Sequence, residues 1–169
     1  MDPEPMSVEL RAPAHLVSRR AIAFWTVRAL IGWIVIVGIQ LVILIASGST
    51  HHRWVNVLIL ACSVLLGAVH LIVMPRWRYR VHRWEITRTA CYSQSGWITQ
   101  ERRIAPLSRI QTVDSERGPL EQLFKLANIT VTTASAAGAI KIHGLDSSAA
   151  DRIVHELTTI AALDGGDAT

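Results

Sequence analysis

The side chains that could perform catalysis are few, and no supporting pattern accompanies them. Asp114 and Glu116 are two residues apart, which would place both carboxylates on one face of a strand. No partner base is evident beside them, so a solvated strand edge explains them better than acid–base catalysis. His143 and His155 are single histidines without the spacing of metal ligands, and Ser147-Ser148 lacks the Gly-x-Ser-x-Gly pattern of a nucleophile elbow. We therefore expect no catalytic residue and no enzyme activity.

The two cysteines predict neither a disulfide nor a metal centre. No Cys-x-x-Cys motif and no Cys/His cluster is present. Cys62 lies in an apolar run and Cys91 in a strand-like segment beyond it, so a disulfide would require a membrane-buried thiol to meet a surface thiol. We expect the chain to hold no metal and no cofactor.

Arginines gather directly after the second of two long apolar runs. They are Arg76, Arg78, Arg80, Arg83 and Arg88. The first three are spaced by two, which in a strand places them on one face. Such a face, leaving a bilayer directly, would meet the anionic inner leaflet, where each cation contributes about 1 kcal/mol. The sequence predicts membrane-surface contact for these five arginines; the alternative is that they only set topology, without lipid specificity. Nucleic-acid binding is not expected, because the basic patch is tethered at the membrane and lacks a reading element.

Two apolar runs dominate the first half of this 169-residue chain, of which 50% is hydrophobic and only 18% charged. They cover residues 29–46 and 54–74, and at 1.5 Å per residue they reach about 27 and 31 Å, close to the hydrocarbon thickness of a bilayer. Pro75 is expected to end the second helix. Buried core helices are a poor alternative, because apolar residues lie on every side. A secretory signal is also disfavoured, since a second span follows the first.

The two runs are expected to pair as an antiparallel transmembrane hairpin over residues 21–75, because only a short turn separates them. Ser63 and Gly67 form a small-xxx-small pair that predicts close packing of the helices. The polar side chains Gln40, Asn56 and His70 are expected to hydrogen bond across the hairpin or near its ends rather than to form a proton path.

The flanking arginines predict the orientation of the hairpin. Four precede the first span, one lies in the turn and five follow the second span. This positive-inside pattern places both termini in the cytoplasm and predicts a multi-pass protein of the plasma (inner) membrane.

The residues after the hairpin, 76–163, read as a small cytoplasmic α+β domain. Strand patterns occur at residues 79–86, 91–93, 97–104, 110–115, 129–133 and 140–142, and a short helix is expected after Gly118-Pro119. The C-terminal segment has an amphipathic stripe that includes Ile153 and Leu157, so a helix should close the domain. A bent antiparallel sheet or partial barrel capped by this helix satisfies the order. Residues 1–20 are expected to form a cytoplasmic tail and residues 164–169 a flexible one.

Three linked segments carry a resemblance to a known family. They are residues 104–113, 117–120 and 123–131, preceded by the two helices, and together they resemble the bacterial PH-like domain of membrane-flanked proteins. The resemblance covers roughly residues 21 to 145; one departure is Lys125, where family members often carry Gly. It implies a pleckstrin-homology fold in a small integral membrane protein without known catalysis. The basic loop of relatives that bind inositol phosphates has no counterpart, so that activity is not carried over.

Three functions follow as hypotheses. The first is a non-catalytic protein- or lipid-binding module at the inner membrane surface, whose partner is a neighbouring membrane protein or a second copy, bound through β-augmentation. The second, implied by the resemblance, is an accessory component of an antimicrobial-peptide resistance or export system. The third, an enzyme, has the least support.

Overall fold

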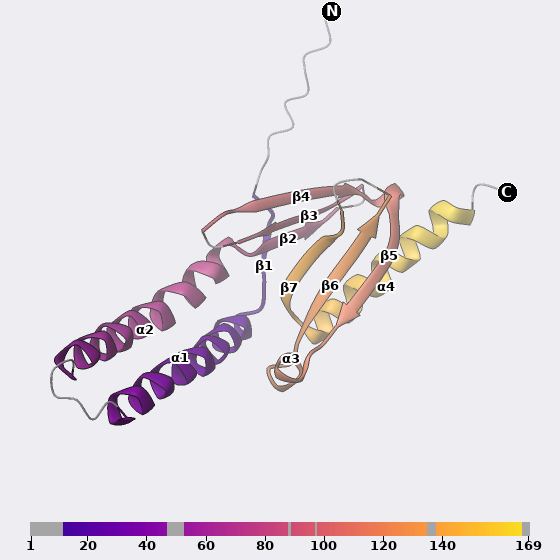
Figure 1. Cartoon of the computed structure of the whole chain (residues 1–169). Coiled ribbons are helices and arrows are strands. Elements are labelled where there is room, and N and C mark those ends of the chain that lie inside the picture. Colours follow the sequence, from indigo (N-terminus) through magenta and orange to yellow (C-terminus); the bar gives the residue numbers. More distant parts are fainter. Residues whose placement is uncertain (1–11, 47–52, 88, 97, 135–137, 167–169) are drawn as a thin grey trace, which may run out of the picture.

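The computed structural model describes residues 12–46, 53–87, 89–96, 98–134 and 138–166, with side chains up to residue 159. Two long helices, α1 (Arg20–Ala46) and α2 (Arg53–Val81), run antiparallel and project from one side of a small domain (Figure 1). We call this pair the hairpin.

Each helix of the hairpin is long and apolar enough to cross a membrane, and in the most apolar stretch of each helix almost no residue is buried. Exposed side chains such as Ile34, Ile45 and Leu65 lie all around the two helices. A buried core helix would instead hide most of its apolar side chains against the rest of the protein.

The prediction that Pro75 ends the second helix is wrong, because α2 continues through it to Val81. An interior proline removes one backbone hydrogen bond. Here the last turn is held by tertiary contacts: the Arg78 guanidinium lies 4.7 Å from the ring centre of Trp25 on α1. These contacts override the local stop signal, so the predicted strand at residues 79–86 is reduced to its final part.

Two antiparallel sheets form the domain. The first has the order β1 (His15–Leu16), β2 (Arg83–Ile86), β3 (Ala90–Ser95), β4 (Glu101–Pro106). The second has the order β5 (Ile110–Glu116), β6 (Leu126–Thr133), β7 (Ile140–Asp146). A 3-10 turn, η1 (Leu107–Arg109), joins the sheets, and α3 (Pro119–Leu123) joins β5 to β6. The sheets also meet where the Ser93 hydroxyl of β3 donates to the Lys141 carbonyl of β7 at 3.0 Å.

The closing helix, α4 (Ser147–Gly166), packs against the second sheet and completes the main core. Strand β6 alternates buried and half-buried residues, as its β-branched pattern predicts, and Ile129 and Val131 face Ile153 and Leu157 of α4 within one cluster. The predicted α+β class, with a PH-like sheet domain capped by a C-terminal helix, is confirmed.

Cys91 belongs to this core and is fully buried, whereas the sequence suggested a surface position. Its strand pairs on both sides, with β2 and β4, so one face of it must point inward. Burial raises the pKa of the Cys91 thiol to about 11. Cys62 and Cys91 are both free cysteines.

A second core joins the hairpin to the domain. Its buried members are Val17, Ala21, Phe24, Trp25 and Leu126. The first turns of α1 reach this position because Gly144, with φ of +76°, lacks a Cβ that would lie 3.0 Å from the Cβ of Ala21. The Ser18 amide donates to the Gly144 carbonyl at 2.9 Å. Residues 15–25 are therefore part of the domain, which differs from the simple tail expected over residues 1–20.

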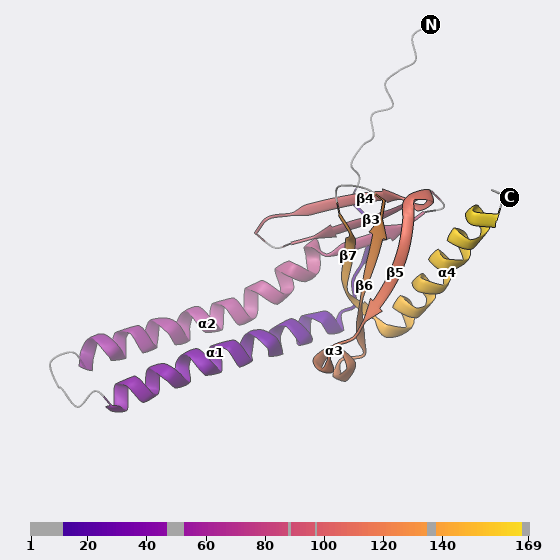
Figure 2. The ribbon, with the colours of Figure 1, turned by 45° about the vertical axis from the view of Figure 1, so that its right-hand side comes forward.

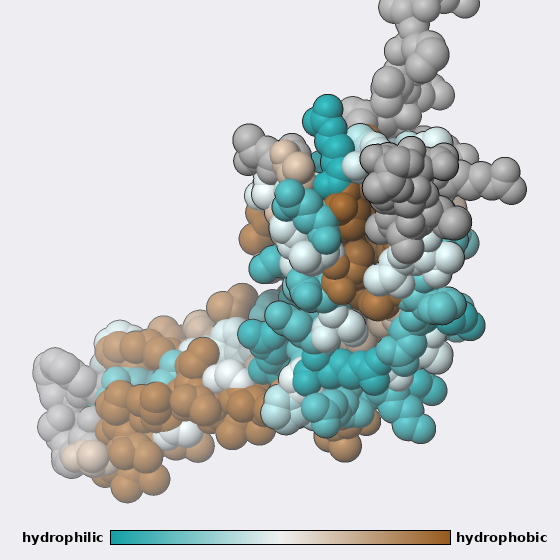
Figure 3. Space-filling model, turned by 90° about the vertical axis from the view of Figure 1, so that its right-hand side faces the viewer, coloured by the Kyte–Doolittle hydropathy of each residue, from teal (hydrophilic) through white to brown (hydrophobic). Residues whose placement is uncertain are grey.

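The surface chemistry divides the molecule into two parts. In the space-filling view the hairpin is largely brown, whereas the domain is mainly teal and white (Figure 3). In two views the strands of the second sheet succeed one another in the order β7, β6, β5 away from the hairpin (Figures 1 and 2).

Candidate functional site

The arginines predicted to share one strand face lie on a helix instead. Because a helix turns 100° per residue, positions two apart point to nearly opposite sides, whereas positions four apart share a side. Arg76 and Arg80 are accordingly both exposed, and Arg78 is half-buried over Trp25. The prediction of a single face for all three arginines is wrong; the structure brings together Arg76 and Arg80 only.

The other two predicted contact residues differ in position. Arg83 opens β2 and is half-buried, and its guanidinium donates to the Pro13 carbonyl at 3.4 Å. Arg88 lies outside the described residues. Membrane contact by either arginine stays a prediction.

A histidine connects the end of the hairpin to the domain. His82 follows α2 directly, is 2% exposed, and its ring lies 5.1 Å from the Trp25 ring. Its Nδ1 lies 2.8 Å from the Arg78 carbonyl, which fits a neutral imidazole with the proton on Nδ1. Burial first, and then the Arg78 charge, lower the pKa of His82 to about 4. His82 is therefore uncharged at neutral pH.

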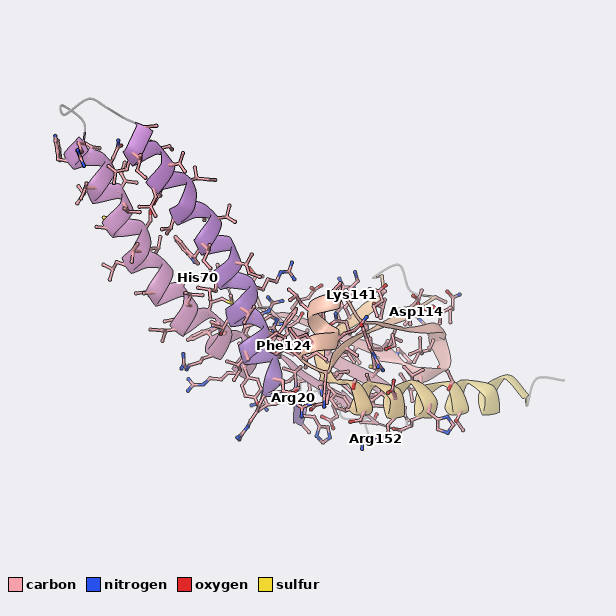
Figure 4. The ribbon with its side chains drawn as sticks, turned by 90° about the horizontal axis from the view of Figure 1, so that it is seen from below. Arg20, His70, Asp114, Phe124, Lys141 and Arg152 are labelled. Atoms are coloured by element: carbon pink, nitrogen blue, oxygen red, sulfur yellow. The ribbon has the colours of Figure 1, made fainter. Side chains whose placement is uncertain are left out.

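Polar and small residues lie between the two helices of the hairpin. The Gln40 amide donates to the Ser63 hydroxyl at 2.8 Å, and the Trp33 indole donates to His70 Nδ1 at 2.9 Å. Gly67 is buried beneath Trp33, where an added Cβ would lie 3.0 Å from the indole. Figure 4 shows His70 within the hairpin. The two small residues Ser63 and Gly67 thus both lie where α2 faces α1.

The residues considered for catalysis are not brought together. Asp114 and Glu116 lie exposed along β5, and Asp114 accepts a hydrogen bond from the neighbouring Thr112 hydroxyl at 3.4 Å. His143 is half-buried on β7, where burial lowers its pKa, and His155 is exposed on α4. In the described part of the chain no group of three His, Cys, Asp or Glu side chains could hold a metal ion.

Strand β5 forms an open edge of the second sheet. It pairs with β6 along one side, and within the described ranges no strand pairs with its other side. Five of its seven residues are exposed, and only Ile110 and Val113 are half-buried. Seven residues of β-strand span about 23 Å, which is enough for a partner strand to pair along the whole edge.

Two hollows lie where the sheets meet. One, of about 380 Å³, is lined by arginines of β4 and η1, namely Arg102, Arg103 and Arg109, together with residues of β6 and β7. The other, of about 180 Å³, contains Ser93, Lys141 and His143. Arg103 lines both, and it is held by the Glu101 carboxylate at 2.6 Å and by the Ala139 carbonyl at 3.0 Å. This arginine therefore connects β4 to the residue directly before β7.

Sequence reasoning missed the contribution of the N-terminal arginines. Arg19 and Arg20 are two of the four arginines that precede the first span, which the sequence analysis counts only as topology signals. An antiparallel hairpin, however, must bring the start of its first helix beside the end of its second. The Arg20 guanidinium lies 3.5 Å from the Asp146 carboxylate of β7. Arginines flank both spans on the side of the termini, and the hairpin brings these flanks together. These two facts could have predicted that arginines from the start of α1 and the end of α2 lie side by side.

Comparisons with known proteins agree with the fold and with the membrane assignment. The family described as Bacterial PH domain matches residues 22–159. The transmembrane protein YdbS of Bacillus subtilis (strain 168) is 28% identical over 158 residues, which cover 92% of this chain and 97% of that protein. No solved structure gives a significant match.

Proposed function

The chain belongs to the bacterial PH domain family and is a membrane protein, and from this premise we propose that its domain is a non-catalytic module that binds a partner protein at the cytoplasmic surface of the inner membrane. The partner is a neighbouring membrane protein or a second copy of the chain. It binds by adding a strand to the outer edge of β5.

The observation that carries this proposal is the open β5 edge. An unpaired edge presents a row of backbone N–H and C=O groups, which is a template for pairing with another chain. The edge belongs to the strand of the second sheet that lies farthest from the hairpin, so the two membrane helices do not obstruct it (Figures 1 and 2).

The second core supports the same proposal. A binding edge on a loosely tethered domain loses orientational freedom when it meets a partner in the membrane, and this loss weakens binding. Here Ala21 and Trp25 of α1 are buried in the domain, so the edge is held in one orientation relative to the membrane helices. A partner embedded in the same bilayer then meets a preoriented strand.

Site-specific crosslinking tests the proposal. A photoreactive residue at Ser115, on the β5 edge, should form an adduct of one defined mass in intact membranes. The same probe at His155, exposed on α4, should not form it. Adding Thr112→Lys to the Ser115 probe should weaken the adduct, because charged edge residues oppose strand addition.

A matched control is Thr158→Lys on α4, which adds the same charge away from the edge and should leave the adduct unchanged. The proposal fails when the Ser115 and His155 probes give the same adducts, or when Thr112→Lys and Thr158→Lys have equal effects.

A further inference from the structure

A basic hollow of about 360 Å³ lies where the two membrane helices enter the domain. Its lining comprises Arg19 and Ile22 at the start of α1 with Arg76, Tyr79 and Arg80 near the end of α2. No carboxylate is part of this lining. Figure 4 shows nitrogen-tipped side chains projecting around this end of the hairpin, near the labelled Arg20.

Within the described residues, the charges of the three arginines of the hollow are not compensated by acidic side chains. Among the residues that the structure describes, no carboxylate lies within ion-pair distance of Arg19, Arg76 or Arg80. Neighbouring Arg20, by contrast, has Asp146 as its partner. Arg76 and Arg80 are four residues apart on one helix face, where like charges repel each other. An anion between them would remove that repulsion.

The position of the hollow along the hairpin matches the depth of lipid headgroups. The apolar run of α2 ends at Met74, after about 31 Å of helix, which already spans the hydrocarbon core. Arg76 is the second residue beyond it, and Arg80 follows one turn later. The half-exposed Trp77 lies between them, as is typical of the membrane interface.

The chemistry of the lining fits a phosphate diester. Guanidinium groups donate paired hydrogen bonds to phosphate oxygens, and the Tyr79 hydroxyl is a further donor. Arg76 is already oriented, because its guanidinium donates to the Ile72 carbonyl at 2.7 Å. The N-terminus of α1 adds a partial positive charge beside Arg19. Ile22 supplies an apolar contact of the kind that a lipid, unlike free phosphate, can use.

We propose that this hollow binds the headgroup phosphate of an anionic phospholipid from the leaflet that faces the domain, with Arg19, Arg76 and Arg80 as its ligands. An anionic lipid is favoured over a zwitterionic one because the latter brings its own cation into a site that already carries three positive charges. The site is separate from the β5 edge and does not depend on partner binding there.

Native mass spectrometry of the detergent-solubilised full chain tests the site. Dioctanoyl phosphatidylglycerol should bind more tightly than dioctanoyl phosphatidylcholine or inorganic phosphate. The double variant Arg76→Gln/Arg80→Gln should bind phosphatidylglycerol roughly thirtyfold more weakly, because each cation near a membrane surface contributes a factor of about five in affinity. The variant Arg76→Lys/Arg80→Lys keeps the charge but loses the paired donors. Its affinity for phosphatidylglycerol should therefore lie between that of the unmodified chain and that of the double glutamine variant.

The matched control is Arg109→Gln/Arg152→Gln, which removes the same charge from the domain surface; Figure 4 shows Arg152 on α4, away from the hairpin. It should retain the affinity of the unmodified chain, and circular dichroism establishes that each variant is folded. The proposal is overturned by equal binding of phosphatidylcholine, by equal binding of inorganic phosphate, or by equal losses in the two glutamine variants.

Discussion

Lys125 adopts a left-handed backbone conformation, with φ of 55°, in the turn between α3 and β6. Hydrogen bonds fix this turn: the Lys125 amide donates to the Gln122 carbonyl at 3.0 Å, and its carbonyl accepts from the Ser147 amide at 3.0 Å. The Lys125 side chain is exposed, so its burial does not compensate for the strain of this backbone conformation. A residue with a Cβ is disfavoured in this conformation, so glycine would be the less strained residue at this position.

Lys125→Gly is expected to raise the free energy of unfolding by up to about 1 kcal/mol, because it relieves the left-handed strain. Lys125→Ala removes the same charge and keeps the strain, so it should change stability by less than about 0.5 kcal/mol. Denaturation of the detergent-solubilised chain, followed by near-ultraviolet circular dichroism, measures both. A gain for Ala equal to that for Gly would show that charge, not backbone strain, is responsible.

His82 predicts a dependence of stability on pH. Its pKa is lowered to about 4 in the folded chain, against about 6.5 when unfolded, so the unfolded state takes up the proton first as pH falls. Its full contribution is present above pH 6.5 and is lost between about 6.5 and 4. The loss should be about 2 to 3 kcal/mol.

His82→Gln should flatten this part of the pH profile, whereas His155→Gln, on the surface of α4, should keep the original slope. Thermal unfolding in detergent at pH 7, 5.5 and 4.5 compares the three proteins. A slope that His82→Gln leaves unchanged would assign the pH dependence elsewhere, for example to His143, whose pKa burial also lowers.

At the scale of elements, the packing of the hairpin depends on one small residue of α2. Gly67 lies under Trp33, and the Trp33 indole donates to His70. A larger side chain at position 67 must move the indole and stretch that hydrogen bond. Gly32 provides the matched comparison, because an added Cβ there would meet nothing within 4 Å.

Gly67→Leu should therefore destabilise the hairpin by about 1 to 3 kcal/mol, as overpacking commonly does. Gly32→Leu should be neutral or slightly stabilising, since leucine is the better helix former. Unfolding from mixed micelles by added sodium dodecyl sulfate, followed by far-ultraviolet circular dichroism, measures the difference. Equal effects of the two substitutions would mean that the helices do not pack through Gly67.

Elements with a strong pattern could be predicted from the sequence, and those fixed by distant contacts could not. The apolar runs and the β-branched strand around Ile129 and Val131 carry their own periodicity. The extension of α2 beyond Pro75 depends on Trp25, some fifty residues earlier, and the two-residue strand β1 has no pattern of its own. The basic hollow could not be predicted either, because the sequence pattern suggested a strand at Arg78 and Arg80. Only in a helix do Arg76 and Arg80 share a side from which Arg78 points away.

At the scale of the whole molecule, the arginine distribution predicts the orientation in the membrane. A fluorescent protein that matures only in the cytoplasm should fluoresce when fused after Thr169 and stay dark when inserted at Thr50, because the hairpin returns the chain to the side from which it started. Alkaline phosphatase, active only outside, should show the opposite pattern. A reversed result would place the domain on the outer side of the membrane.

The second core has a mechanical consequence for this domain. Because Ala21, Phe24 and Trp25 are part of this core, no flexible linker separates the membrane-crossing part of α1 from the domain. A membrane that becomes thinner makes long apolar helices lean away from the bilayer normal. The domain must then rotate together with the helices, so that the thickness of the membrane sets the angle between the β5 edge and the bilayer.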